Sequence, residues 1–390
     1  MRLNLPAARS GRVVAALGTA QTIGWASSYY LPAVLAAPMA ESLGLSPVWV
    51  FGAFSMAMVV SALVGPSAGA RIDRFGGRGV LAVSNLVFAV GLAILAAAGS
   101  VPVLFLGWAV IGIGIGMGLY EAAFATLAGI YAGKARGPIT GITLIAGFAS
   151  TVGWPLSGLM LASWGWREAC LGWAALHLFL ALPLNLILPR GRPVERQALA
   201  EPLPEEGPPP PRFAMAILAF VFAATWFTST AMAAHLPGLL QAAGASAAAA
   251  IAAGALIGPA QVVARLLEFG FLRRFHPLAS ARLAAAAHPL AAVVLVLVGG
   301  PAAYAFTLLH GAGNGILTIA KGTLPLAIFG PGGYGQRLGW LGAPARILQA
   351  GAPLIFGAAL SAWGVGAVWL TAGIGAAALG ALFCLRRSAA

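Results

Sequence analysis

Four ionisable side chains lie inside long apolar stretches of this 390-residue chain: Glu121, Arg265, Lys321 and Arg346. A charge surrounded by hydrocarbon costs free energy unless it faces a partner or a wettable cavity. An ammonium and a guanidinium that share such a cavity can bind an anion through charge-assisted hydrogen bonds. A buried carboxyl can take up and release a proton. The sequence therefore predicts Lys321 and Arg346 as an anion-binding pair and Glu121 as a proton carrier.

Polar residues at helical spacing accompany these charges. His310, Asn314, Thr318 and Lys321 fall on one face of a helix, because residues three or four positions apart share a face. Glutamines lie one turn from each arginine, and a polar and aromatic stripe begins at Gln21. The predicted substrate-binding residues, in chain order, are Gln21, Trp25, Tyr29, Gln261, Arg265, His310, Asn314, Lys321, Arg346 and Gln349.

Each of these residues also has a plain structural interpretation. Lys321 and Arg265 lie near the ends of their apolar stretches, where a long side chain reaches the membrane surface along its own stem. Arg346 can serve helix packing, and Glu121 can remain neutral and hydrogen-bonded. The aromatic stripe is equally well explained by helix packing or by an interfacial belt.

The elements that must position these side chains are membrane-spanning helices. The chain is 60% hydrophobic and 8% charged, far from the composition of a soluble domain. Apolar stretches of 18 residues or more can cross the hydrocarbon core, and the first has no cleavage site typical of a signal peptide. Twelve such stretches are expected, at 13–36, 47–69, 79–98, 102–131, 138–162, 168–189, 212–237, 246–268, 279–300, 302–328, 338–361 and 363–385.

Basic residues indicate how these helices are oriented. Eighteen basic residues fall at the termini or in connections on the same side of the membrane as the termini. Only Arg167 falls in a connection on the opposite side. This asymmetry predicts a multi-pass protein of a bacterial inner membrane with both termini in the cytoplasm. The net charge of +13 then reflects topology, and no nucleic-acid partner is expected.

A polar, proline-rich segment divides the chain in two. We expect an N-terminal six-helix half at 1–188, a cytoplasmic linker at 189–211 and a C-terminal six-helix half at 212–390. The halves look related, because Gly65-Pro66 recurs as Gly258-Pro259 and Gly153-x-Pro155-Leu156 recurs as Gly351-x-Pro353-Leu354. The expected fold is an all-α membrane protein made of two pseudo-repeats, with a substrate site between them.

The segment GARIDRFGGR, Gly69 to Arg78, carries a family resemblance. It resembles the loop between the second and third helices of the major facilitator superfamily, with Gly77 in place of one basic residue. The resemblance covers the whole chain, and in that family the loop braces neighbouring helices in one conformation. It implies a conformational latch formed by Gly69, Asp73, Arg74, Gly76 and Arg78. The alternative is a basic loop that only sets topology.

A weaker similarity concerns Gln261-x-x-x-Arg265. It resembles an acid, three residues and an arginine in monocarboxylate transporters of the same superfamily, with glutamine in place of the acid. The resemblance implies that the anion-pairing role of the arginine carries over to Arg265. It implies no proton role for Gln261.

Histidines and cysteines suggest no further chemistry. The five histidines are scattered without metal-ligand spacing, and His288 is expected to be a packing residue with its hydrogen bonds satisfied. Cys170 and Cys384 lie at opposite faces of the membrane, so no disulfide is expected. No cofactor, metal or catalytic residue is predicted, and an enzyme is disfavoured.

These features together predict a secondary transporter that works by alternating access. Its cargo is expected to be a small organic anion of monocarboxylate type, moved with or against protons by a monomer embedded in lipid. An exporter of drugs or of toxic metalloids such as arsenite is the alternative within the same class. A transporter-like membrane sensor is the alternative from another class.

Overall fold

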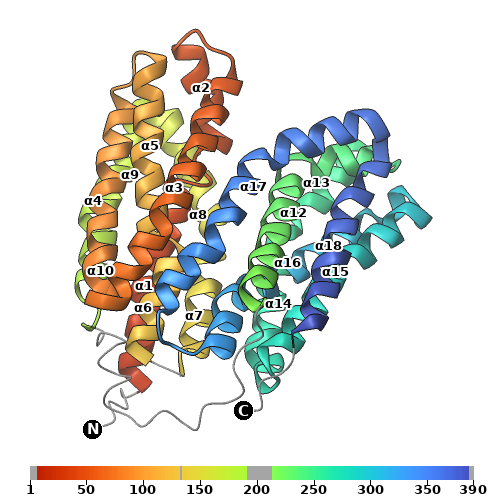
Figure 1. The fold of residues 1–390 in the computed structure, drawn as a ribbon. Helices are drawn as coiled ribbons and strands as arrows, with labels where there is room; N and C mark the ends of the chain where they lie inside the picture. The colour runs from red at the N-terminus through yellow and green to blue at the C-terminus, as the bar shows by residue number, and fades with distance from the viewer. Residues whose placement is uncertain (1–6, 132–133, 191–212, 386–390) are drawn as a thin grey trace. The chain divides into compact units, whose positions relative to one another are not determined.

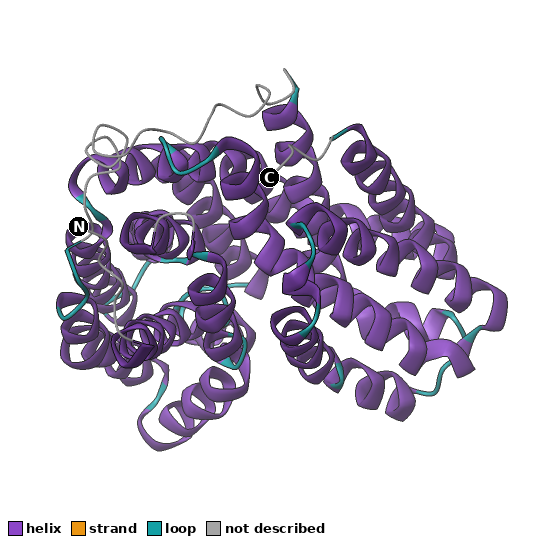
Figure 2. Cartoon of the chain, turned by 90° about the horizontal axis from the view of Figure 1, so that it is seen from below, coloured by secondary structure: helices purple, strands orange, loops and turns teal. Residues whose placement is uncertain are grey.

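The structure is a computed structural model that describes residues 7–131, 134–190 and 213–385. Within these ranges every regular element is a helix, and no strand occurs (Figure 2). The all-α prediction is therefore confirmed. The predicted linker lies outside the described residues, except for Pro189 and Arg190. Residues 1–6 and 386–390, whose basic side chains support the predicted orientation, also lie outside them.

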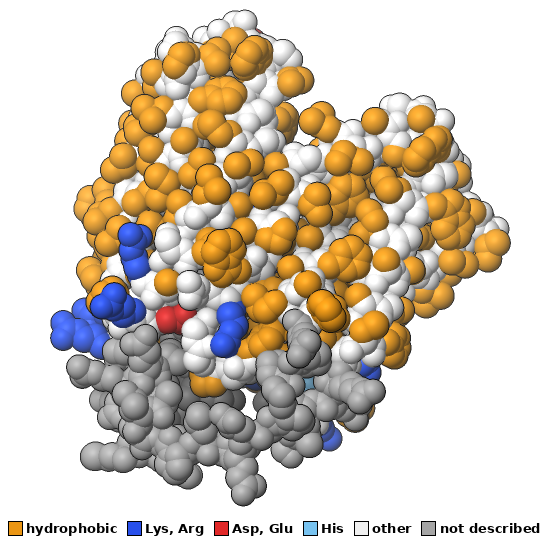
Figure 3. Space-filling model, viewed as in Figure 1, with side chains coloured by type: hydrophobic (Ala, Val, Ile, Leu, Met, Phe, Trp, Pro, Cys, Tyr) orange, Lys and Arg blue, Asp and Glu red, His pale blue; other side chains and the backbone are white. Residues whose placement is uncertain are grey.

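Nine helical stretches of the described chain are long and apolar enough to cross a membrane. They are Pro47–Phe75, Gly77–Ala96, Val101–Tyr131, Arg136–Trp164, Trp166–Leu186, Ala214–Ala242, Ala247–Gly270, Pro277–Val298 and Tyr334–Cys384. Apolar side chains cover much of the surface seen in Figure 3, and Phe179 and Leu297 are 81% and 80% exposed. Such surfaces are typical of helices that contact lipid. The number of twelve crossings stays a prediction.

The chain forms two compact units, and Figure 1 labels the helices of which they consist. Unit 1 comprises Met1–Pro202 and Gly330–Ala343, and unit 2 comprises Leu203–Phe329 and Pro344–Ala390. Helix α17 (Tyr334–Trp363) therefore contributes its first residues to unit 1 and the rest, from Pro344 onward, to unit 2.

The described residues of unit 1 form ten further α-helices and one π-helix. They are α1 (Ala7–Ser27), α2 (Pro32–Ser42), α3 (Pro47–Phe75), α4 (Gly77–Ala96), α5 (Val101–Gly118), α6 (Tyr120–Tyr131), α7 (Arg136–Ala146), α8 (Ala149–Trp164), α9 (Trp166–Leu176), η2 (His177–Ala181) and α10 (Leu182–Leu186). Several stretches predicted as single helices are thus interrupted. The stretch 102–131, for example, divides at Leu119, whose extended ψ of −162° ends α5.

Glycines allow the helices of unit 1 to pack closely. A Cβ atom at Gly112 of α5 would lie 2.5 Å from the carbonyl oxygen of Ala57 on α3. A Cβ atom at Gly116, one turn later, would lie 2.9 Å from the carbonyl oxygen of Ser61. Small residues at such crossings let helix backbones approach in a membrane, where packing provides much of the attraction.

Unit 2 is built from α12 (Ala214–Ala242), α13 (Ala247–Ala255), α14 (Ile257–Gly270), α15 (Pro277–Val298), α16 (Ala303–Phe329), the later part of α17 and α18 (Val368–Cys384), with the short helices η3 (Leu272–Arg274), η4 (Gly300–Ala302) and η5 (Gly364–Ala367). Its main core contains the buried rings of Phe306 and Phe356, together with Leu236, Leu239 and many alanines. The small alanines let α15 and α16 lie side by side, which places the polar residues of both helices within reach of each other.

Candidate substrate and proton sites

The structure brings Lys321 and Arg346 to the same aromatic ring. The Lys321 Nζ atom lies 3.7 Å from the centroid of the Trp226 ring, and the Arg346 Cζ atom lies 5.7 Å from it. Lys321 is 9% exposed and Arg346 is 4% exposed. All three residues belong to unit 2, on α16, α17 and α12 respectively. Both cations are within the usual range of cation–π attraction.

Trp226 was not among the residues predicted from the sequence. It lies in the middle of α12, close to the polar residues Thr225, Thr228 and Thr230. Tryptophans in membrane helices favour the interfaces, so a tryptophan among threonines at mid-helix is a signal that could have identified it. We therefore add Trp226 to the candidate site.

The stripe on α16 divides between two surroundings. Lys321 lies at the Trp226 ring, whereas His310 and Asn314 line a pocket inside unit 2. The two ends of the stripe are eleven residues apart, which is about 16 Å along a helix. Thr318 lies between them and donates a hydrogen bond to the Asn314 carbonyl at 2.8 Å. The stripe is thus continuous along α16, but one end contacts the Trp226 ring and the other end lines the pocket of unit 2.

Arg265 joins α14 to α16. Its side chain is buried, its Nε atom donates to the Gly315 carbonyl at 3.4 Å, and its Nη2 atom donates to Oε1 of Gln261 at 3.1 Å. Gly315 permits this crossing, because a Cβ atom there would lie 2.6 Å from the Gln261 carbonyl oxygen. These two contacts support helix packing, and an anion-binding role for Arg265 stays a prediction.

Gln21 binds the point at which α5 ends. Its Nε2 atom donates to the Gly118 carbonyl at 2.6 Å, and the side chain is buried. The last carbonyls of a helix have no donor within the helix itself, so Gln21 supplies one. Sequence spacing indicated a polar stripe here but gave no sign of the break in the facing helix.

We expect Gln21→Leu to destabilise the protein by about 1–3 kcal/mol, because it leaves the Gly118 carbonyl buried without this donor. Thermal unfolding of the purified protein in detergent measures the effect. Thr140→Val is the matched control, since the buried Thr140 hydroxyl donates to the Arg136 carbonyl of its own helix. Equal unfolding midpoints for Gln21→Leu and the unmodified protein would contradict the structural role.

Trp25 and Tyr29 belong to an aromatic cluster in unit 1. The Trp25 ring centroid lies 5.4 Å from that of Tyr29 and 4.9 Å from that of Tyr120. The Tyr29 ring in turn lies 5.7 Å from Phe54 on α3. Tyr120 and Phe54 were missed from the sequence, because their contact depends on the rotation of three different helices.

Glu121 lies in the first turn of α6, directly after the break at Leu119. A helix N-terminus carries partial positive charge, which favours a carboxylate there. The side chain is half-buried and faces the start of α17, since a Cβ atom at Gly342 would lie 3.5 Å from Oε1 of Glu121. The structure does not place Glu121 in the same unit as Lys321 and Arg346.

Asp73 binds the N-terminal end of α17 within unit 1. Its Oδ1 atom accepts from the backbone N–H of Gly335 at 2.8 Å, and its Oδ2 atom accepts from that of Gln336 at 2.9 Å. The backbones touch here, because a Cβ atom at Gly69 would collide with the carbonyl group of Gly335. A carboxylate at a helix N-terminus satisfies amides that have no partner within the helix.

Other residues of the segment 69–78 have separate tasks. Gly76 has a φ of 83°, a conformation that suits glycine, and it ends α3 and begins α4. Arg74 is exposed and lies over the Phe75 ring, with its Cζ atom 5.2 Å from the centroid, while Arg78 is half-buried. A side chain at Gly77 would collide with Thr126, which explains why the basic residue of the pattern is missing.

A comparison with known families agrees with these observations on the segment 69–78 and on the helical fold. The sequence model of the Major Facilitator Superfamily matches residues 17–316, which is more than half of the chain. The chain belongs to the Major Facilitator Superfamily. It is therefore a multi-pass membrane protein of a transporter family, as the resemblance predicted.

Two related proteins are similar in sequence to part of this chain. An uncharacterized 38 kDa protein in the 23S RNA operon of Thermoproteus tenax is 35% identical over 162 residues, 40% of this chain and 42% of that protein. A multidrug resistance protein B homolog of Mycobacterium tuberculosis is 33% identical over 137 residues, 35% of this chain and 25% of that protein. The matches thus span less than half of the length of either relative.

Solved structures of superfamily transporters share the fold over almost the whole chain. The human organic anion transporter MFSD10 has a TM-score of 0.71 at 19% identity and covers 96% of this chain and 99% of its own. The proton:xylose symporter XylE has a TM-score of 0.75 at 15% identity, with 96% and 95% covered. FucP in the outward conformation has a TM-score of 0.73 at 15% identity, with 97% and 99% covered.

Proposed function

We propose that this superfamily member is a secondary transporter of small organic anions, with Lys321, Arg346 and Trp226 at the centre of its binding site. The convergence of two buried cations on one indole carries the proposal. An ammonium and a guanidinium at one ring can bind an anion through charge-assisted hydrogen bonds. The indole can pack against the apolar part of an organic anion.

Two further observations support an organic anion. Gln349, one turn from Arg346, is buried and adds an amide that can donate to a carboxylate. The human transporter that shares this fold is named for organic anions, although its 19% identity makes this an analogy of fold. Arg265, Gln261, His310, Asn314, Gln21, Trp25 and Tyr29 remain proposed contributors to cargo binding.

The remaining features of the proposal concern coupling and placement. Transport proceeds by alternating access between two halves, 1–188 and 212–390, joined by a cytoplasmic linker. The bonds from Gly335 and Gln336 to Asp73 act as the latch of one conformation and break in the other. Both termini lie in the cytoplasm, and the protein resides as a monomer in a bacterial inner membrane.

A stability screen of the purified protein tests the cargo class. Ligands that bind the folded state raise the unfolding midpoint by mass action. We expect acetate, lactate, pyruvate or benzoate to raise it, while glucose and the lipophilic cation tetraphenylphosphonium do not. Flux of the stabilising anion into proteoliposomes then tests transport. Stabilisation by the cation alone would overturn the anion proposal, and anion binding without flux would favour a membrane sensor.

One observation favours drug export as a second candidate. The Mycobacterium tuberculosis relative is named for multidrug resistance, and the aromatic cluster around Trp25 provides rings that can bind apolar cations. In that case tetraphenylphosphonium stabilises the protein, and Trp25→Ala reduces the shift while Lys321→Gln leaves it unchanged.

Glu121 is the proposed proton carrier, and Glu121→Gln tests it. We expect the variant to exchange the anion down its own gradient but to lose the response of flux to an imposed proton gradient, because glutamine cannot ionise. Proteoliposomes with a set pH difference measure this response. Glu168→Gln is the matched control, since Glu168 also lies in the first turn of a helix but is exposed. Proton-driven accumulation by Glu121→Gln would show that another group carries the proton.

A further inference from the structure

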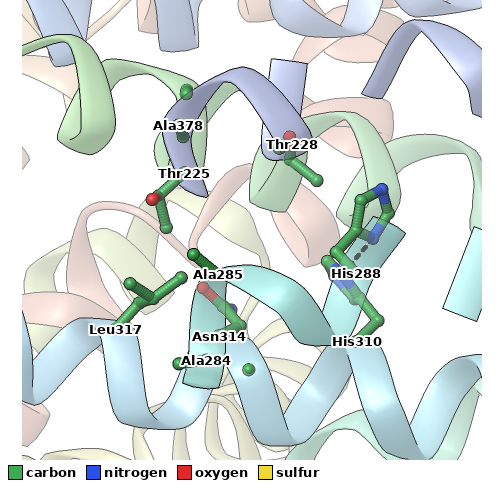
Figure 4. Close-up of a pocket in the computed structure, with 12 residues that line it drawn as sticks. Thr225, Thr228, Ala284, Ala285, His288, His310, Asn314, Leu317 and Ala378 are labelled. Carbon is green, nitrogen blue, oxygen red and sulfur yellow. Dashed lines mark hydrogen bonds between the residues drawn. The ribbon is translucent and has the colours of Figure 1, made fainter. Parts of the chain in front are cut away.

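A pocket inside unit 2 contains two histidines, His288 and His310, and is separate from the Trp226 ring at the centre of the proposed anion site. Helices α12, α15, α16 and α18 line it, and its polar lining consists of Thr225, Thr228, His288, His310 and Asn314 (Figure 4). Its volume is about 40 Å³. Space of that size beside the polar side chains has room for about three water molecules.

The hydrogen bonds of His288 determine which of its nitrogens carries the proton. The Thr371 hydroxyl donates to the Val368 carbonyl at 3.0 Å, so its oxygen is available as an acceptor. The Nε2 atom of His288 lies 2.9 Å from that oxygen, and we assign Nε2 as the donor because the hydroxyl proton is directed to Val368. In a neutral imidazole the other nitrogen then has no proton. The Nδ1 atom of His288 is therefore an acceptor.

The partner of that acceptor is His310. The two Nδ1 atoms are 3.0 Å apart, as the dashed line in Figure 4 marks, so Nδ1 of His310 must be the donor. By the same rule for a neutral imidazole, Nε2 of His310 carries no proton. His288 is 8% exposed and His310 is 4% exposed, so both rings are enclosed, and both line the pocket.

We propose that the His288–His310 pair binds a single proton at Nε2 of His310. The imidazolium formed in this way still donates from its Nδ1 atom to His288, now through a stronger, charge-assisted bond. The bond from His288 to Thr371 is also kept, so the first proton breaks no hydrogen bond of the chain. A second proton would place two N–H groups face to face, which limits the pair to one. The inference goes beyond the proposed function, because it predicts proton binding in unit 2 whatever the cargo is and without Glu121.

Other charged groups do not enter this pocket. The charged or titratable residues on the neighbouring helices of unit 2 are His235 on α12, Arg265 and Glu268 on α14, Arg282 on α15, Tyr304 and Lys321 on α16, Arg346 on α17 and Cys384 on α18. None of them lines the pocket, and α13 and α18 have no Asp, Glu, Lys or Arg within their described bounds. Arg282 is the nearest along α15, and its guanidinium donates to the carbonyls of Leu382 and Leu385. The two imidazoles are thus the titratable groups of the pocket.

His177 in unit 1 provides an internal comparison. It is also buried, but its Nδ1 atom bonds to Oδ1 of Asn85 at 2.8 Å and its Nε2 atom bonds to the Ser27 hydroxyl at 2.7 Å. The Asn85 amide nitrogen donates to the Leu81 carbonyl, so the Asn85 oxygen accepts from Nδ1 of His177. Nε2 of His177 then accepts from the Ser27 hydroxyl at 2.7 Å, which is shorter than the 3.4 Å from that hydroxyl to the Gly24 carbonyl. Both nitrogens of His177 are therefore occupied. Burial is common to the three histidines, whereas a nitrogen that can accept a proton without loss of a bond occurs only in the pair.

Nitrogen NMR of the full-length protein with ¹⁵N-labelled histidine tests the proposal. The coupled signals of His288 and His310 identify themselves through the N–H···N bond between them. As the pH is lowered from about 8 to the lowest value at which the protein stays folded, we expect these signals to move together with one midpoint, while the His177 signal does not move. In His310→Gln, the movement of the His288 signal should be lost. Two separate midpoints, no movement of either signal, or an unchanged His288 response in that variant would overturn the proposal.

Thr371→Val provides a milder variant if His310→Gln does not fold. Valine has nearly the shape of threonine, but it cannot accept the bond from Nε2 of His288. We expect the pair to titrate still as one, with a shifted midpoint, and an unshifted midpoint would overturn the direction assigned to the hydrogen bonds. None of these measurements uses an anion or a flux, so their failure is distinct from a failure of the proposed transport.

Discussion

Lys321→Gln is expected to abolish binding of the cargo anion while the protein still folds. Loss of one partner from a buried charge interaction costs about 2–5 kcal/mol. Because each 1.4 kcal/mol is a tenfold change, the affinity should fall by about 30-fold to several thousand-fold. Arg346→Gln should have a loss of the same order, since both side chains lie at the Trp226 ring. The anion-induced rise of the unfolding midpoint and the flux into proteoliposomes measure both losses.

Arg282→Gln is the matched control for these variants. Arg282 also belongs to unit 2 and also lies over an aromatic ring, with its Cζ atom 4.6 Å from the Phe383 centroid. Its guanidinium binds backbone carbonyls, so we expect its loss to lower stability without changing the response to the anion. If Lys321→Gln retained the full anion response, the cationic site would have no part in cargo binding.

Gly69→Ala is expected to open the contact between α3 and the start of α17. The added methyl group would collide with the backbone of Gly335, which cannot move aside as a flexible side chain can. Overpacking of this kind costs about 1–3 kcal/mol. The bonds from Gly335 and Gln336 to Asp73 should be lost with it, and hydrogen exchange of those two amides should become faster. Mass spectrometry of the exchanged protein reads this directly.

Gly79→Ala shows whether that effect is specific. Gly79 lies in α4, and no atom lies within 4 Å of a Cβ atom placed there. A methyl group at a helical glycine with free space is neutral or stabilises by about 0.4–1 kcal/mol, because it restricts the unfolded chain. Equal exchange at Gly335 in the two variants would mean that the backbone contact at Gly69 does not hold α17 in place.

The fold class could be predicted because hydropathy is a property of whole segments. A stretch of twenty apolar residues indicates a membrane helix whatever its neighbours are, and the GARIDRFGGR segment indicated the family. The interruption of α5 and α6 at Leu119 could not be predicted in the same way. No proline or charge lies at Leu119, and the donor that stabilises the break, Gln21, comes from a helix about one hundred positions earlier.

The candidate site was predicted in part for a similar reason. Lys321 and Arg346 stand out because a charge inside an apolar stretch is visible in the sequence. Trp226 carries no charge, so only the packing of α12 against α16 shows that it meets Lys321. His288 was expected to be a satisfied packing residue. Its bond to His310 depends on how α15 and α16 are rotated against each other, which spacing within either helix does not determine.

Gly77 has a consequence for how substitutions accumulate in this protein. The Thr126 hydroxyl is bound to the Ala122 carbonyl at 2.8 Å, so the threonine side chain fills the space that a side chain at 77 would need. An arginine at 77 becomes acceptable only after Thr126 is replaced by a smaller residue. Positions 77 and 126 therefore constrain each other, and a basic residue at 77 requires a second change at 126.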